Sequence, residues 1–201
     1  MVIFMWTKEL FGTDVYHLVS AFIIYSMLGW LVESIYMSFC NRRLTNRGFA
    51  KSPFCPIYGF GAVIGYLVLC PLRTDLFRLY LTGAVMATVF EFLVGKLMLR
   101  LFGEVWWDYN NKPCNYKGIV CLESTVSWGF YAVIIIVFLH SRVMDFIDSW
   151  SFSMGSRICT LILGVVTVDY IIQLMNVLHI DISEQKERLI DRYHEFKTRW
   201  Y

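Results

Sequence analysis

Apolar residues in this chain gather in long runs that are separated by short polar segments. Five such runs stand out, and most of them reach the roughly 20 residues that a helix needs to cross a bilayer. They cover residues 18–40, 57–72, 79–102, 119–139 and 158–179, and the second run is short and rich in glycine. The pattern predicts an all-α fold, a polytopic membrane helical bundle with about five transmembrane helices, of which the second is short or re-entrant.

The segments around these runs predict how the chain is divided. No linker or low-complexity tract interrupts it, so residues 1–180 are expected to form one membrane bundle in which residues 1–16 are a short surface helix. Residues 181–201 are highly charged, but Ile182, Leu189 and Phe196 recur every seven residues. This spacing predicts a cytosolic or interfacial amphipathic tail helix, and the alternative is a solvated extension of the fifth transmembrane helix.

The composition agrees with a membrane protein. Hydrophobic residues make up 57% of the chain and the mean hydropathy is +0.54, whereas charged residues make up 17%, below the roughly 25% of soluble domains. A net charge of +2, with the basic residues in loops, does not favour nucleic acid as a partner. The six cysteines include no CxxC pair, so they predict neither a metal site nor a disulfide framework.

The basic residues also predict an orientation. With five crossings, thirteen of the eighteen Lys and Arg residues fall on the side that holds the tail and the loops after the first and third runs. By the positive-inside rule that side is cytosolic, which places the N-terminus outside and the C-terminus in the cytosol. This assignment requires that residues 57–72 cross the membrane fully.

Ionisable residues inside the apolar runs are the main functional signal. Glu33 shares one helical face with Ser26 and Gly29, and Glu91 lies in a seam of small residues on the third run. Glu123 begins the fourth run and Asp169 lies on the fifth. Because a charge in hydrocarbon costs several kcal/mol, such residues need polar partners and usually mark pathways or sites. They predict a polar cavity, and the alternative is that each carboxylate only holds two helices together.

Two loops on the predicted cytosolic side supply partners for this cavity. Arg47 follows the first run, and its guanidinium is the expected counter-charge, for a carboxylate or for a substrate phosphate. In the third loop, Trp106 and Tyr109 are typical of an interfacial anchor, whereas Asp108 between them is predicted to face inward toward Arg47. The histidines carry no nucleophile–base signature, and His140 is expected at the end of a transmembrane run.

Several short motifs carry a family resemblance. They are YSMLGWLVES (residues 25–34), Asn46-Arg47-Gly48, Cys55-Pro56-Ile57-Tyr58-Gly59, Glu91, Trp106-Trp107-Asp108-Tyr109, and the run from Gly118 to Trp128-Gly129. In order and spacing the chain resembles the CmpB-like type IV ABC-transporter permease family of bacterial integral membrane proteins. It departs from the family pattern at Lys51-Ser52-Pro53, where Gly-Pro is expected after the turn. The resemblance implies a multi-pass protein of the bacterial cytoplasmic membrane.

Two functions follow as hypotheses. The first is a transporter permease component that moves a small solute or ion through the cytosolic-side polar cavity. Its partners would be membrane lipids, and a homo-oligomer is compatible with it. Because the sequence holds no P-loop, its ATPase would be a separate cytosolic subunit. The alternative is a membrane-embedded enzyme acting on a lipid headgroup or prenyl phosphate, with Mg²⁺ at the carboxylate cluster. The candidate pocket residues are Glu33, Asn46, Arg47, Tyr58, Glu91, Asp108, Tyr109 and Glu123.

Overall fold

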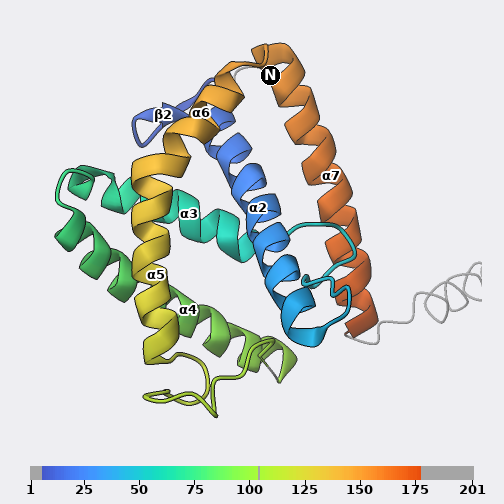
Figure 1. The fold of residues 1–201 in the computed structure, drawn as a ribbon. Coiled ribbons are helices and arrows are strands. Elements are labelled where there is room, and N and C mark those ends of the chain that lie inside the picture. Colours follow the sequence, from blue (N-terminus) through green and yellow to red (C-terminus); the bar gives the residue numbers. More distant parts are fainter. Residues whose placement is uncertain (1–5, 104, 178–201) are drawn as a thin grey trace, which may run out of the picture.

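Five long helical segments form the structure, a computed structural model that describes residues 6–103 and 105–177 (Figure 1). The first two are α2 (Val15–Asn41) and α3 (Pro56–Leu69), which continues into the short 3₁₀ turn η1 (Cys70–Leu72). The third is α4 (Leu76–Phe102). The fourth joins α5 (Leu122–Val133), the π-helical η2 (Ile134–Leu139) and α6 (His140–Asp148), and the fifth is α7 (Phe152–Val177). The all-α helical bundle expected from the sequence is therefore confirmed.

Local sequence signals set several helix ends. The Asp14 side chain caps α2 by accepting a hydrogen bond from the His17 backbone N–H, and Asp75 caps α4 in the same way through the Arg78 N–H. Helix α4 ends at Gly103, whose φ of 76° is left-handed and so favours glycine. These caps explain why the long apolar runs start and stop where they do.

Three of the described helices are long and apolar enough to cross a membrane: Val15–Asn41, Leu122–Asp148 and Phe152–Val177. Helix α4 is equally long and presents an apolar stripe to the outside at four-residue intervals, formed by Leu81, Val85, Val89, Leu93 and Leu97. Because four residues are close to one helical turn, these side chains lie on one face, as expected of a surface that faces lipid. The protein is thus a multi-helix membrane protein.

The second segment runs along α2 first as an irregular loop, residues 42–55, and then as the short helix α3. After α2 ends at Asn41, the chain turns back along it, and the Cys55 N–H donates to the Ser26 carbonyl at 3.1 Å. Ser26 lies fifteen positions before Asn41, about 22 Å along the helix axis. Helix α3 then completes the passage, since Arg73 beyond its end lines a surface cleft together with Phe11 from the N-terminal side. The loop and the short helix together reach from one end of α2 to the other.

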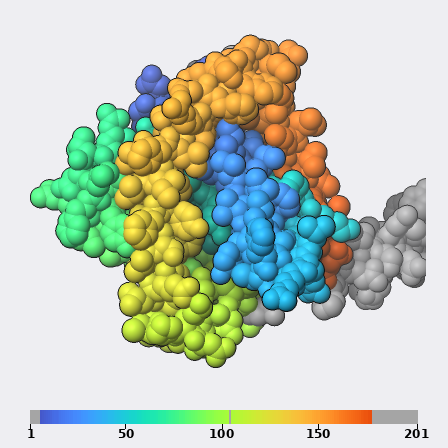
Figure 2. Space-filling view, in the orientation of Figure 1, coloured from blue at the N-terminus to red at the C-terminus, as the bar shows by residue number. Residues whose placement is uncertain are grey.

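Close contacts between small residues and rings let α3 lie against α2. A Cβ atom at Gly29 would overlap the Tyr58 ring, and one at Gly59 would overlap Ser26 and Phe22. Small residues permit this approach of two helix backbones, which is common between membrane helices. Figure 2 shows α2 (blue) between the α5–α6 helix (yellow to orange) and α7 (dark orange), with the 42–55 segment (light blue) beside its C-terminal half on the side of α7.

Three boundaries differ from the sequence prediction by more than one helical turn. Residues 9–14 are not helical: β1 (Glu9–Leu10) and β2 (Thr13–Asp14) form an antiparallel hairpin, which turns through Phe11 and Gly12 at positive φ. The fourth helix runs to Asp148 instead of ending at 139, because the polar residues after 139 interrupt the apolar run but not the helix. The fifth begins at 152, not 158. The predicted tail helix at 181–201 lies outside the described residues.

Candidate functional site

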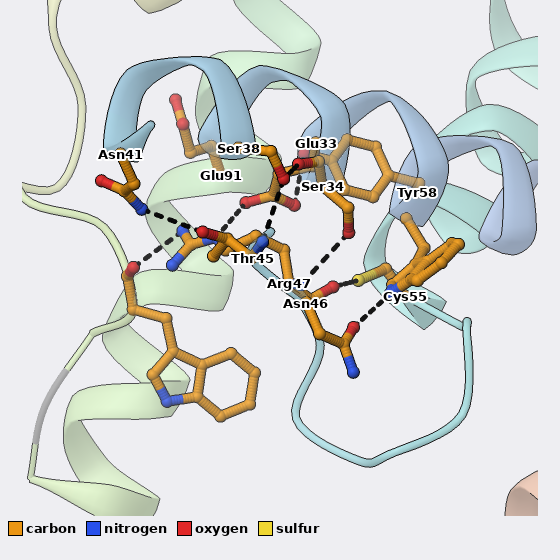
Figure 3. A network of polar contacts seen from close by, with 12 residues as sticks. Glu33, Ser34, Ser38, Asn41, Thr45, Asn46, Arg47, Cys55, Tyr58 and Glu91 are labelled. Carbon is orange, nitrogen blue, oxygen red and sulfur yellow. Dashed lines mark hydrogen bonds and ion pairs between the residues drawn. The ribbon is translucent and has the colours of Figure 1, made fainter. Parts of the chain in front are cut away.

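An ion pair between the first helix and the loop that follows it is the centre of the first polar network (Figure 3). Arg47 Nε donates to Glu33 Oε1 at 3.0 Å, and the Tyr58 hydroxyl donates to Glu33 Oε2 at 3.0 Å. Glu33 lies eight residues before the end of α2, about 12 Å along the axis. Both carboxylate oxygens of Glu33 therefore accept hydrogen bonds from other segments of the chain. Arg47 is the counter-charge that the sequence predicted.

Further contacts hold Arg47 in place. Its backbone N–H donates to Ser34 Oγ at 3.1 Å, and its carbonyl accepts from the Cys55 thiol at 3.2 Å. Its Nη2 donates to the Trp106 carbonyl at 2.9 Å, which joins the 42–55 segment to the 103–121 loop. We call Glu33, Ser34, Arg47, Cys55 and Tyr58 the Glu33 network. Because both the backbone and the side chain of Arg47 are bonded, the guanidinium has a defined position.

Asn46 stabilises the turn next to this network. Its Oδ1 accepts from Trp30 Nε1 at 2.6 Å, and its Nδ2 lies 3.5 Å from the Lys51 carbonyl. Lys51 belongs to the stretch where the chain departs from the expected family pattern. Asn46 therefore contacts the helix and its own loop, and it supports Arg47 from the outside of the turn.

A second network surrounds Glu91 on α4. Its Oε1 accepts from the Tyr109 hydroxyl at 3.2 Å, and its Oε2 accepts from Ser124 Oγ at 3.2 Å and from Trp128 Nε1 at 3.0 Å. The Glu91 side chain is 5% exposed. Ser124 and Trp128 are four residues apart on α5, so both point to the same side of that helix. We call Glu91, Tyr109, Ser124 and Trp128 the Glu91 network.

The two networks adjoin each other. The Tyr58 and Trp128 rings, one from each network, lie with centroids 6.4 Å apart. Burial raises the pKa of the Tyr109 hydroxyl, and the negative charge of Glu91 and, more weakly, that of Glu33 raise it further. Tyr109 thus lies in the field of both carboxylates. Polar side chains from α2, α3, α4, α5 and two loops converge in the same end of the bundle.

Other acidic residues lie outside these networks. Glu123 is exposed, and its bond with Lys112 at 2.8 Å raises the pKa of that lysine. Asp108 does not face Arg47, so that expectation is wrong: its Oδ1 accepts from the Asn110 N–H at 2.8 Å and from Asn110 Nδ2 at 2.7 Å. A bond from a side chain to the backbone two residues later is a local Asx-type turn, and Asp108 is exposed.

Asp169, on α7, lies outside both networks and bonds the 42–55 segment. Its Oδ2 accepts from the Ser52 backbone N–H at 2.6 Å, which fastens the 42–55 segment to α7. Tyr170, the next residue, donates its hydroxyl to the Phe54 carbonyl at 2.8 Å. The fifth helix thus supports the re-entrant loop, while Glu33 and Glu91 are the two carboxylates brought together.

Sequence reasoning missed some participants. Ser34 and Ser124 contribute hydroxyls, and Trp128 contributes its indole N–H. The adjacency of Ser34 to Glu33, and the four-residue spacing of Ser124 and Trp128, were the available signals. Small polar residues and tryptophans are frequent in membrane helices, so these signals do not single out a site. Within the described ranges, no group of three or more His, Cys, Asp or Glu side chains is placed to hold a metal ion.

Comparison with protein-family models matches residues 20–174 to the family described as Putative ABC-transporter type IV. The chain belongs to this family. The matched range contains both the Glu33 network and the Glu91 network. No curated protein and no solved structure matches the chain. Family membership and the apolar helices together make it a transporter-related membrane protein.

Proposed function

We propose that this family member is the membrane permease component of a transport system, and that the Glu33 and Glu91 networks form the polar region through which a small solute or ion passes. One observation carries the proposal: two carboxylates from different helices, one of them paired with a guanidinium, lie in adjoining polar networks inside an apolar bundle. Ionisable groups at this depth usually mark a substrate or ion path.

The form of the second segment supports this assignment. Irregular backbone at membrane depth is tolerated where protein covers it or where it lines a cavity, and broken helices often form transporter binding sites. Here the 42–55 segment brings Arg47 to α2, and α3 begins beside it with Tyr58 in its first turn. The first turn of a helix carries partial positive charge, which favours the Glu33 carboxylate and would favour an anionic group in its place.

The contacts also suggest how a solute would be received. Each group in the Glu33 network has a protein partner, so the arrangement is a closed one. A solute that offers a carboxylate or phosphate can replace Glu33 at the Arg47 guanidinium, and a cation can replace Arg47 at Glu33. In either case the exchange breaks the ion pair between the 42–55 segment and α2 and leaves the segment held by its backbone bonds to Ser34 and Ser26. Binding of solute and movement of the loop are thereby coupled.

The partners follow from the same arrangement. The end of the bundle that holds both networks also carries the exposed basic residues Arg42, Arg43, Lys51, Lys112 and Lys117. We propose that this end faces the cytosol of a bacterial cell and that a separate ATPase chain docks on the 42–55 and 103–121 loops. Movement of the Trp106 carbonyl, which accepts from Arg47, would transmit docking to the network.

Native mass spectrometry of the full chain, purified from its own host in mild detergent, tests the proposal. We expect a complex with an ATPase subunit and a bound small solute. The solute should be lost in Glu33→Gln and Arg47→Ala and kept in Asp75→Asn and Arg78→Ala. The control pair has the same chemistry but lies exposed at the start of α4, where Arg78 bonds Asp75 at 3.1 Å.

The same preparation separates transport from the enzymatic alternative. Turnover of a lipid headgroup or prenyl phosphate by the isolated chain would overturn the transport proposal. So would a solute that is retained equally by all four variants. Mg²⁺ at the carboxylates stays a prediction, which elemental analysis of the purified protein checks.

A further inference from the structure

A buried histidine lies in the other half of the bundle, away from both carboxylate networks. His140 is 8% exposed, and its Nδ1 lies 3.1 Å from the Tyr25 hydroxyl of α2. Its ring stacks on Tyr66 of α3, with centroids 3.5 Å apart and planes 18° apart. The sequence predicted His140 at the end of a transmembrane run; the helix itself continues for eight more residues to Asp148 through an amphipathic segment. His140 is thus a buried ionisable residue where the apolar part of this helix ends.

The helix changes its geometry to place this residue. Ile134–Leu139 is π-helical, and the His140 N–H bonds the Ile135 carbonyl, five residues back. Each residue added to a helical turn rotates the following side chains by about 100°. Such segments are rare and occur frequently at functional sites. The π-helical segment therefore sets which residue of α6 faces Tyr25 and Tyr66.

The second ring nitrogen of His140 has no hydrogen-bond partner within the described part of the chain. Among the described residues Ser52 Oγ is the fully buried side-chain polar atom that lacks a hydrogen-bond partner. His140 Nε2 also lacks a partner, but it is not among the fully buried atoms. Tyr66, which covers the ring, also lines a surface cleft of about 460 Å³ together with Phe11, Cys70 and Arg73.

We propose that His140 is a proton-binding site, loaded through the cleft beside Tyr66, and that its protonation changes the contact between α6 and α2. A neutral imidazole has one N–H, whereas the imidazolium has two. After a proton binds, Nδ1–H must donate to the Tyr25 oxygen, so the Tyr25 hydroxyl hydrogen turns away from the ring. The direction of the α2–α6 hydrogen bond is thereby fixed.

The stacking on Tyr66 offers a charged imidazole a favourable contact. Two neutral aromatic rings prefer offset or edge-to-face arrangements with centroids roughly 4.5–7 Å apart, whereas a cation is attracted to the face of a tyrosine ring. At 3.5 Å and nearly parallel, the Tyr66 face suits an imidazolium. The titratable groups that face His140 are Tyr25 from α2 and Tyr66 from α3, with Cys70 and Arg73 beyond Tyr66. Within the described part of the chain, His140 forms no ion pair.

The site lies where a proton can affect helix packing. A second contact on the same seam joins His17 Nε2 of α2 to Asp148 at the end of α6, at 2.8 Å, and Asp14 holds the other His17 nitrogen. Between His140 and Asp148, α6 spans about 12 Å. The seam is thus formed by two histidine contacts, one at each end. Proton binding at His140 acts on the half of the bundle opposite the Glu33 network.

Nuclear magnetic resonance of the full chain in phosphatidylcholine–phosphatidylglycerol nanodiscs tests this proposal. His140-Ser141 is the one His-Ser pair in the sequence, so carbonyl-labelled histidine with ¹⁵N-serine assigns the residue without a mutation. Ring ¹⁵N shifts are then followed between about pH 5 and 8. We expect both ring nitrogens of His140 to carry protons at the acidic end. Tyr25→Phe and Tyr66→Leu should each lower the midpoint by roughly half a pH unit or more.

Glu123→Gln, seventeen residues before His140 on the same helix and exposed, serves as the control and should leave the His140 midpoint unchanged. Thermal unfolding of each variant in the same nanodiscs shows whether it is folded. A His140 ring that keeps one neutral tautomer over the whole range would overturn the proposal, as would a midpoint that neither tyrosine substitution moves. The readout needs no solute or ATPase, so its failure is distinct from a failure of the transport proposal.

Discussion

The Arg47 guanidinium and the Glu33 carboxylate are bonded at 3.0 Å, and each side chain is 25% exposed. The pair joins a transmembrane helix to the irregular segment that re-enters beside it. Partial burial makes the bond stronger than a surface ion pair and makes the loss of one partner costly, because the other charge is left unpaired. Arg47 and Glu33 thus stabilise the fold of the loop and are at the same time the groups a solute would meet.

A double-mutant cycle on this pair measures its strength. Glu33→Gln and Arg47→Gln should each lower the unfolding free energy in detergent by about 1–3 kcal/mol. The double variant should lose less than the sum, with a coupling energy of about 0.5–3 kcal/mol, since the second substitution removes the orphaned charge. The exposed Asp75–Arg78 pair provides the comparison and should show much weaker coupling. Additive losses at Glu33 and Arg47 would contradict this interpretation.

The contact between Gly29 and the Tyr58 ring sets the approach of α2 and α3. Gly29→Val should displace Tyr58 from Glu33 and lower the thermal unfolding midpoint in detergent, because the new side chain overlaps the ring. Gly164→Val on α7 is the matched substitution, since nothing lies within 4 Å of a Cβ there. Equal midpoints for the two variants would show that the close contact does not govern the packing.

Glu91 accepts three hydrogen bonds, and two substitutions should separate its charge from its bonding capacity. In Glu91→Gln the amide oxygen can still accept from Ser124 and Trp128, while the amide N–H can donate to the Tyr109 hydroxyl. Glu91→Leu leaves the Tyr109 hydroxyl and the Trp128 indole N–H without an acceptor, whereas Ser124 keeps the Cys121 carbonyl, and should cost about 3 kcal/mol or more of unfolding free energy.

Chemical denaturation in detergent, followed by tryptophan fluorescence, compares these variants. Glu123→Leu is the control, because Glu123 is exposed and bonds Lys112 at the surface. We expect the order Glu123→Leu, Glu91→Gln, Glu91→Leu from least to most destabilised. A Glu91→Leu protein as stable as Glu91→Gln would indicate that the donors find other acceptors.

Cysteine labelling tests the predicted orientation. Cys114 is exposed in the 103–121 loop, and Ser149 is exposed between α6 and α7 at the other end of the bundle. In a background with Cys40 and Cys70 replaced by serine, a membrane-impermeant maleimide applied to intact spheroplasts should label Ser149→Cys and not Cys114. Permeabilised spheroplasts should show labelling of Cys114. The reverse pattern would place the N-terminus in the cytosol.

Part of the site was accessible from the sequence. Glu33, Glu91 and Arg47 stand out because charge is rare in apolar segments and has to be compensated. Their partners were less accessible, since Tyr58, Tyr109 and Trp128 resemble the interfacial aromatics found in any membrane protein. Asp108 was misassigned for a related reason. Its neighbours in sequence do not reveal that Asn110 bonds its carboxylate and turns it outward.

The sequence by itself determined where the helices lie, because the length of an apolar run and the capping residues at its ends are local properties that need no partner. It also indicated that Glu33 and Glu91 would need polar partners. Only the tertiary structure decided which groups meet: Arg47 reaches Trp106 across 59 positions, and Tyr25 reaches His140 across 115. Such contacts depend on the crossing of α2 with α3 at Gly29 and on the π-helical turn before His140. Both arise from packing between distant segments, which hydropathy along the chain does not record.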